Sequence, residues 1–286
     1  MAKKPRMRPS LMLAAFFQEQ EVRQFLAGRG VHTAGEIEKR IEDWKRGRQL
    51  LEQSSEWADT ERPEVIEQPA QLADRVRELT QTDAFRSTVE GLPHQVAVVS
   101  LGQLVAFQFT VDKPYCATFA VPAGRTLEDV ATITLPTTPP KFAVNVGQDA
   151  SGFVVSAPGP NLRVSTMQVQ ASEGGPLRMT VDLTLGSPFV QVAAFAGRMI
   201  LRNGYHRVVS LLTQGVSYAP VILLECTEYA QTGAAGPGFF APHVVMGTKP
   251  PLLKHYLSPF AIEFDAIDYH KAIRLRPDEF QVAVPE

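Results

Sequence analysis

The chain has 286 residues, of which 44% are hydrophobic and 20% are charged, and its formal net charge at pH 7 is -2. These values are typical of a folded protein. They exclude an intrinsically disordered chain, and they exclude a protein drawn to nucleic acid or anionic membranes by its overall charge. The length allows one large domain or two ordinary ones.

The two cysteines and the hydropathy of the chain indicate the cellular compartment in which it works. Cys116 and Cys226 form no CxxC pair, which argues against a cysteine-based zinc site and favours a reducing compartment. No apolar stretch is long enough to span a bilayer. We therefore expect a cytoplasmic protein that makes no contact with a membrane.

The N-terminal residues are basic and lead into an apolar run from Leu11 to Phe17. This run is short for a secretory signal, and Gln18–Glu21 follows it in place of a small-residue cleavage site. We interpret the segment as a basic tail and a helix that is capped by Ser10 and ends at Gly28.

Residues 1–90 hold 31 of the 58 charged residues and are predicted to form a helical N-terminal extension. Thr33 and Glu36 have the spacing of a capping box, and the helix after them places Ile41 and Trp44 on one side. A further helix is predicted from about Pro69 to Val89. One hypothesis is that this extension binds a protein partner.

From residue 96 onward the signals favour strands. An apolar run at 96–99 predicts a first strand, and residues 113–187 are predicted to form a β-rich insertion. Residues 189–195 and 198–201 are separated by two residues and predict a hairpin, and residues 271–276 predict a last strand. The second predicted domain therefore covers residues 96–286.

The run from Met199 to Leu224 predicts a strand, a tight turn, a helix that ends at Gly215, and an apolar strand. The turn reads Asn203-Gly204-Tyr205-His206-Arg207. Gly204 allows a sharp bend, and the first turn of the helix leaves backbone N–H groups free for phosphate oxygens. Arg207 adds a planar cation, and His206 can move a proton near neutral pH.

This arrangement resembles the ParB/sulfiredoxin-like superfamily, in which the equivalent turn holds nucleotide phosphates. The resemblance covers 96–112 and roughly 189–224. It implies an α/β ParB/sulfiredoxin-like domain with the β-rich insertion and the helical N-terminal extension. It also implies a nucleoside triphosphate (ATP or CTP) with Mg²⁺ as the cofactor, bound by Asn203, Gly204, Tyr205, His206 and Arg207.

The chain departs from the members of that superfamily at informative positions. Sulfiredoxins have a cysteine where this chain has Tyr205, which argues against sulfinic reductase chemistry. No helix-turn-helix pattern follows Leu224, which argues against the centromere binding of ParB partition proteins. Free-serine kinases place an acidic base soon after the first strand, and here Asp112 would stand in for it. We predict His206 and Asp112 as the catalytic residues.

Three functions stay open on the sequence alone. The first is a nucleotide-binding protein that acts as an NTPase or phosphotransferase. The alternative is a non-catalytic regulatory or partner-binding module in a DNA-associated or phage-defence system. A third reading, a ParB-like nuclease, would need an acidic metal cluster and a basic groove that the sequence does not display, so binding to nucleic acid stays undecided.

Overall fold

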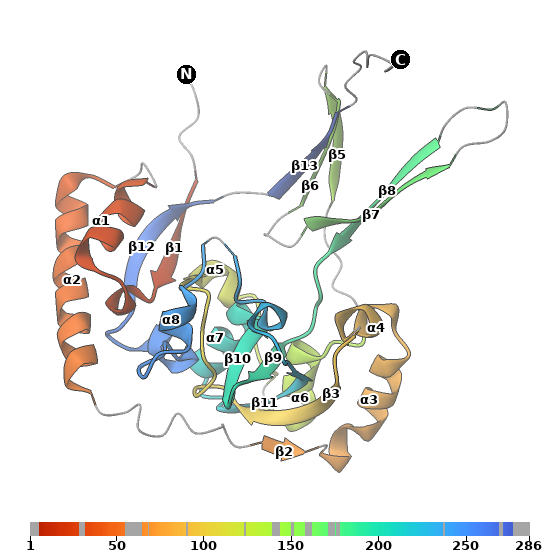
Figure 1. The fold of residues 1–286 in the computed structure, drawn as a ribbon, viewed down its shortest axis with the longest axis horizontal. Coiled ribbons are helices and arrows are strands. Elements are labelled where there is room, and N and C mark those ends of the chain that lie inside the picture. The colour runs from red at the N-terminus through yellow and green to blue at the C-terminus, as the bar shows by residue number, and fades with distance from the viewer. Residues whose placement is uncertain are drawn as a thin grey trace, which may run out of the picture. The chain divides into compact units, whose positions relative to one another are not determined.

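A computed structural model describes residues 6–28, 32–54, 65–67, 69–89, 91–122, 124–138, 144–149, 152–157, 162–170, 175, 178–236, 238–268 and 271–276 (Figure 1). The chain divides into two compact units. The first unit comprises Met1–Pro139 and Ser187–Asp268, and the second comprises Pro140–Gly186 and Tyr269–Glu286. The chain combines helices with several sheets, which confirms the α/β class.

The first unit contains a five-stranded sheet and a three-stranded sheet. The five-stranded sheet has the order β10 (Arg198–Asn203), β9 (Gln191–Phe195), β11 (Tyr218–Glu225), β3 (His94–Ser100) and β2 (Val65–Glu67). Strands β9 and β11 are parallel, and the other neighbours are antiparallel. The three-stranded sheet is antiparallel, in the order β12 (Ile262–Ile267), β1 (Met7–Met12) and β4 (Thr110–Asp112).

The helices of the first unit connect and cover these sheets. They are α1 (Glu19–Gly28), α2 (Ala34–Gln53), α3 (Ala73–Thr80), α4 (Asp83–Val89), α5 (Lys113–Cys116), α6 (Leu127–Thr134), α7 (Tyr205–Thr213) and α8 (Pro242–Val245). Short 3₁₀ helices lie at Ala14–Phe16, Ala70–Leu72, Tyr229–Thr232 and Leu253–Leu257. Among the described residues, no helix combines the length with the apolar character that a membrane crossing needs.

The central strands of the five-stranded sheet are buried on both faces. On one face Val221 and Leu223 of β11 share a core cluster with Val208 of α7. On the other face Ile222 shares a second cluster with Leu79 of α3. An apolar run without alternation is the expected sequence of a strand covered on both sides, so the predicted strand before Leu224 is confirmed.

Several local predictions are confirmed. Thr33 and Glu36 form the capping box of α2, and Ile41 is buried beneath that helix. Strands β9 and β10 form the predicted hairpin through Ala196 and Gly197, which both have positive φ, as a type I′ turn requires. The last predicted strand is β13 (Lys271–Leu275).

The N-terminal prediction is wrong at its start. Ser10 caps no helix, because it lies in β1 and pairs with Phe264 on one side and Asp112 on the other. The first α-helix begins only at Glu19. Pairing with two strands that are distant in sequence overrides the local helix signal, and a local reading of the sequence cannot detect such pairing.

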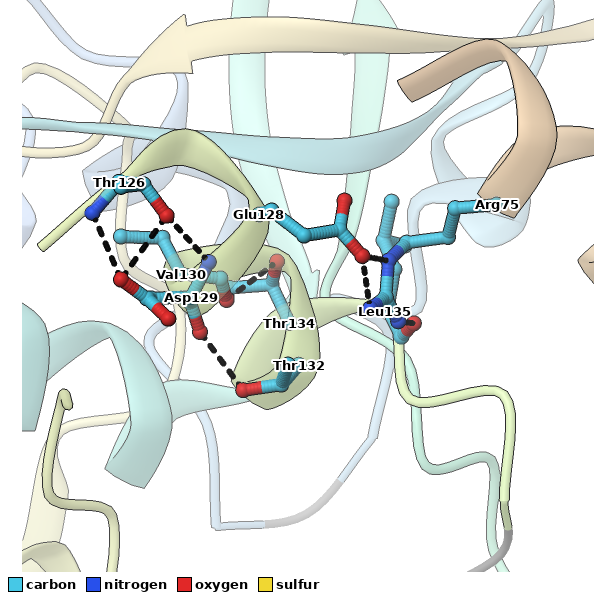
Figure 2. Close-up of polar contacts among 8 residues, drawn as sticks. All are labelled: Arg75, Thr126, Glu128, Asp129, Val130, Thr132, Thr134 and Leu135. Carbon is cyan, nitrogen blue, oxygen red and sulfur yellow. Dashed lines mark hydrogen bonds and ion pairs between the residues drawn. The ribbon is translucent and has the colours of Figure 1, made fainter. Parts of the chain in front are cut away.

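The predicted division at residue 90 also differs from the observed units. Residues 1–90 contribute β1 and β2 to the two sheets of the first unit. Arg75 of α3 donates to the Glu128 carboxylate through Nε at 2.8 Å and to the Leu135 carbonyl at 3.0 Å (Figure 2). Thr126 and Asp129 form a capping box that starts α6 and so places Glu128 in its first turn. The predicted extension is thus bound into the first unit.

The second unit begins later than the predicted insertion at 113, because α5 and α6 belong to the first unit. It contains a three-stranded antiparallel sheet in the order β13, β6 (Gly152–Ala157) and β5 (Asn145–Asp149). Strands β7 (Leu162–Gln170) and β8 (Arg178–Leu185) form a hairpin. The C-terminal strand β13 therefore completes the β-rich unit.

Candidate functional site

The turn between β10 and α7 depends on glycine. Gly204 is the N-cap of α7 with φ 101° and ψ 22°, in the left-handed region. A Cβ at this position would lie 2.7 Å from Cγ2 of Val190 and 3.2 Å from its Cα. Both the backbone conformation and the close approach exclude a larger residue. The predicted succession of strand, glycine turn and helix is confirmed.

Asn203 and Tyr205 use their side chains inside the protein. Asn203 Nδ2 donates to the carbonyls of Ser187 and Phe189, both at 2.9 Å. The Tyr205 hydroxyl accepts from the backbone N–H groups of residues 107 and 108 at 2.8 and 3.2 Å, and burial raises its pKa. These bonds hold neighbouring loops against the turn, which differs from the predicted contact of both side chains with a nucleotide.

His206 lies beside the segment that contains Asp112. Its ring packs edge-on against Tyr115 of α5, with the ring centroids 4.9 Å apart. Burial lowers the pKa of His206 to about 4, and the negative charge of Asp112 opposes this shift only in part. His206 is therefore neutral at pH 7. The structure brings the two predicted catalytic residues, His206 and Asp112, into one cluster.

Asp112 is held by two groups within this cluster. Its Oδ2 lies 2.6 Å from Nε of Arg8 on β1, and its Oδ1 accepts the N–H of Tyr115 at 2.9 Å. The second bond makes Asp112 the N-cap of α5. A base must be free to accept a proton from a substrate, so catalysis by Asp112 would require a change in these contacts.

Arg207 is buried in the first turn of α7. It is 9% exposed, and its guanidinium carbon lies 5.4 Å from the ring centre of Phe119. Within the described ranges no carboxylate forms an ion pair with Arg207, and burial lowers its pKa. The Phe119 carbonyl accepts from Ser210 Oγ and Gln214 Nε2, so α7 itself holds the ring that faces this arginine.

The N-cap residue of α7 provides no side-chain cap. Gly204 has no side chain that could accept a hydrogen bond from the first N–H groups of the helix. The first N–H groups of an α-helix have no partner within the helix, and they form the positive end of its dipole. Two uncompensated positive features, the helix terminus and Arg207, thus lie within one turn. Such a place suits an anion.

Outside this turn, the described residues form a cavity but no cluster of metal-ligating side chains. Over the described part of the chain, no group of three or more His, Cys, Asp and Glu side chains is placed to hold a metal ion. A cavity of about 380 Å³ lies at the end of α2, lined in part by Arg48 and Lys249. Lys249 Nζ donates to the carbonyls of Leu51, Glu52 and Ser54, so this cation serves to cap α2.

Sequence reasoning missed Arg8, Tyr115 and Phe119. Arg8 reaches Asp112 because β1 pairs with β4 across about 100 residues of chain, and no local signal predicts this pairing. The sequence does contain a signal for Tyr115. An aspartate followed by Lys-Pro is a typical helix start, with an N-cap and an early proline, and it places Tyr115 in the first turn.

Comparison with known proteins gives no family for the chain: no family model, no curated protein and no solved structure matches it.

Proposed function

We propose that the first unit binds a phosphate-bearing ligand, a nucleoside triphosphate, at the N-terminus of α7. The observation that carries this proposal is the buried charge of Arg207. Removing a guanidinium from water is costly unless an anion pairs with it, and contact with an aromatic ring offsets only part of this cost, on the order of 2 kcal/mol. An anionic ligand would complete the pairing that the described residues do not supply.

The neighbouring groups fit phosphate in chemistry and in position. The backbone N–H groups at the start of α7 would donate to phosphate oxygens, and Arg207 would offer two parallel donors to one phosphate. Neutral His206 would donate one further hydrogen bond. In this account Asn203 and Tyr205 position the turn, and their side chains do not touch the ligand.

The resemblance described above makes Mg²⁺ the expected companion of the nucleotide. A cation held chiefly by the phosphate oxygens would need few protein ligands, which is the usual mode for Mg²⁺ at nucleotide sites. It would neutralise phosphate charge and polarise the phosphoryl oxygens. The residues of this chain would bind and orient the phosphates.

A second candidate function is a ligand-dependent regulatory module without turnover. The state of Asp112 favours it, because both of its carboxylate oxygens already bind groups of the protein. Hydrolysis or phosphoryl transfer would need a base, and Asp112 is an acidic residue whose charge acts on His206. Release of phosphate or transfer of a phosphoryl group by the wild-type protein would favour the enzyme over the module.

The test is calorimetry and thermal unfolding of the full chain with ATP, CTP, GTP and UTP, each with Mg²⁺. We expect at least one nucleotide to bind and to raise the unfolding temperature, as any ligand that prefers the folded state does. Arg207→Ala should abolish nucleotide binding. Arg207→Gln keeps most of the packing against Phe119 and should raise the dissociation constant for the nucleotide at least about tenfold.

Arg46→Ala is the matched control, since this exposed arginine on α2 carries the same charge far along the chain. It should leave nucleotide binding unchanged. The absence of binding by every nucleotide to the wild-type protein would overturn the proposal. Equal binding by wild type and by both Arg207 variants would overturn the site.

A further inference from the structure

The described side chains of the hairpin β7–β8 form one apolar face. On β8 the apolar residues alternate from Met179 to Leu185, and each lies opposite an apolar residue of β7. A bulge between Val164 and Thr166 inserts one residue into β7. This residue shifts the alternation of β7 so that its apolar side chains stay on the same face. The cross-strand pairs are Leu162–Leu185, Val164–Leu183, Met167–Val181 and Val169–Met179.

This face is covered at one end of the hairpin and uncovered at the other. Leu162 is buried in a cluster with Val155 of β6. Towards the tip, Met167, Val169 and Met179 are 59%, 66% and 61% exposed. A two-stranded ribbon is at best marginally stable alone in water, so the exposed half gains from added strands.

The outer edge of β8 is open within the described residues. Strands β7 and β8 make a two-stranded sheet (Figure 1). Strand β13 contacts the hairpin through β7. An edge strand presents a row of unpaired N–H and C=O groups, which is a template for pairing with another chain.

The sequence of β8 is complementary to itself about Thr180. The residues on either side of Thr180 are the apolar Met179 and Val181. The next two are Arg178 and Asp182, which are both exposed and carry opposite charges. In an antiparallel pair of two β8 strands centred on Thr180, each Arg178 would lie opposite the Asp182 of the other copy, and each Met179 opposite Val181.

We propose that the chain forms a two-fold symmetric dimer in which β8 pairs with β8 of a second copy about Thr180. Both copies then contribute the same surface, as a two-fold interface requires. Opposite charges in directly opposed positions stabilise an antiparallel pair, and so do two apolar residues in such positions. The four strands β7, β8, β8 and β7 would form one continuous sheet.

The charges of the second unit permit pairing with a second copy, and those of β8 favour one alignment of the two strands. The second unit contains six basic and six acidic residues, with His270 counted as neutral, so two copies have no net repulsion through it. A shift that centres the pair on Arg178 or on Asp182 brings two like charges into opposed positions. Such juxtapositions are destabilising. The register centred on Thr180 places opposite charges together at both ends.

The first test is a charge exchange measured by sedimentation velocity on the full chain, up to about 100 μM, where weak strand-edge dimers are populated. Wild type should form dimers. Arg178→Asp and Asp182→Arg should each raise the dimer dissociation constant at least about tenfold, because each places like charges opposite one another. The double variant R178D/D182R should restore dimerisation.

Arg77→Asp is the control, because it makes the same charge change at an exposed position on α3 of the first unit. It should leave the dissociation constant unchanged. Monomeric wild-type protein across the concentration range would overturn the proposal. A dimer that both single reversals leave intact would overturn it equally.

A cross-link locates the axis. Thr180→Cys should form a disulfide-linked dimer under mild oxidation, because this position lies opposite itself on the two-fold axis, within reach of disulfide geometry. Thr184→Cys, four residues off the axis on the same strand, should remain largely unlinked. Equal cross-linking of the two variants would contradict the register.

Discussion

Among the described residues, the turn at Gly204 and the hairpin β7–β8 differ in the kind of group that has no partner. Around the turn, Asn203 and Tyr205 bond to the backbone of neighbouring loops, and the apolar side chains of α7 are buried. What remains uncompensated there is positive charge. In the hairpin, apolar side chains and a strand edge remain uncovered. On this difference rest the two proposals, an anion site in the first unit and a site for association in the second.

The largest effect should come from Gly204. Gly204→Ala combines a φ of 101° with a Cβ that approaches Val190 to 2.7 Å, so we expect a loss of about 3 kcal/mol in the free energy of unfolding. Gly91→Ala is the control, because Gly91 has φ 75° but open space around a Cβ. It should lose about 1 kcal/mol. Urea unfolding measures both, and equal losses would mean that the contact with Val190 does not constrain the turn.

Tyr205→Phe should rank second. It removes the oxygen that accepts two backbone N–H groups near Phe107 and leaves these donors buried, at a cost of about 2 kcal/mol. Tyr115→Phe is the control, because the Tyr115 hydroxyl forms no hydrogen bond with a described residue. It should change stability by less than about 0.5 kcal/mol. Urea unfolding measures both variants. An unchanged free energy of unfolding in Tyr205→Phe would show that the hydroxyl does not hold this loop.

The pH dependence of stability should be smaller and should depend on His206. Burial lowers the pKa of His206 to about 4, below the ordinary value of 6.5. Between pH 6.5 and pH 4, His206 binds a proton more readily in the unfolded chain than in the folded one. Its contribution to the free energy of unfolding is therefore complete above pH 6.5 and decreases as the pH falls towards 4. His206 alone should contribute about 1 kcal/mol to the loss between pH 6.5 and 5.5.

His206→Gln should remove its share of this loss, measured by urea unfolding at the two pH values. The part that remains is assigned to buried His255, whose pKa burial lowers to about 3. The control His94→Gln changes an exposed histidine and should leave the pH dependence as in wild type. An unchanged slope in His206→Gln would place the titrating group elsewhere.

The smallest effect should come from the exposed face of the hairpin. Met179→Thr changes a side chain that is 61% exposed, and at protein concentrations where the chain is monomeric it should alter stability by less than about 0.5 kcal/mol. Val208→Thr, at a fully buried position of α7, should lose about 2 kcal/mol. Thermal unfolding of the two variants side by side tests the contrast, and a similar loss in both would show that the hairpin face is covered within the monomer.

The sequence allowed prediction where the signal is local. The capping box at Thr33 and Glu36, the two-residue hairpin turn before β10 and the glycine turn at Gly204 each depend on a few adjacent residues. In these places the local conformational preference agrees with the final fold, so a short window of sequence was sufficient.

Prediction failed where distant segments meet. Strand β1 forms because β12 and β4 lie on either side of it, and the ion pair of Arg8 with Asp112 follows from that pairing. The sequence identified the residues of the turn, but it did not predict where their side chains point. Tyr205 points into the protein because the N–H groups of residues 107 and 108 are there, which the turn sequence alone does not disclose.

Amide hydrogen exchange of the full chain, with and without ATP or CTP and Mg²⁺, tests the central claim most directly. The account predicts that the ligand slows exchange of the N–H groups of Tyr205, His206 and Arg207, which have no partner within the helix at the start of α7. The exposed hairpin β7–β8 should exchange as before. Nucleotide binding with unchanged exchange at these three amides would place the ligand elsewhere and contradict the account.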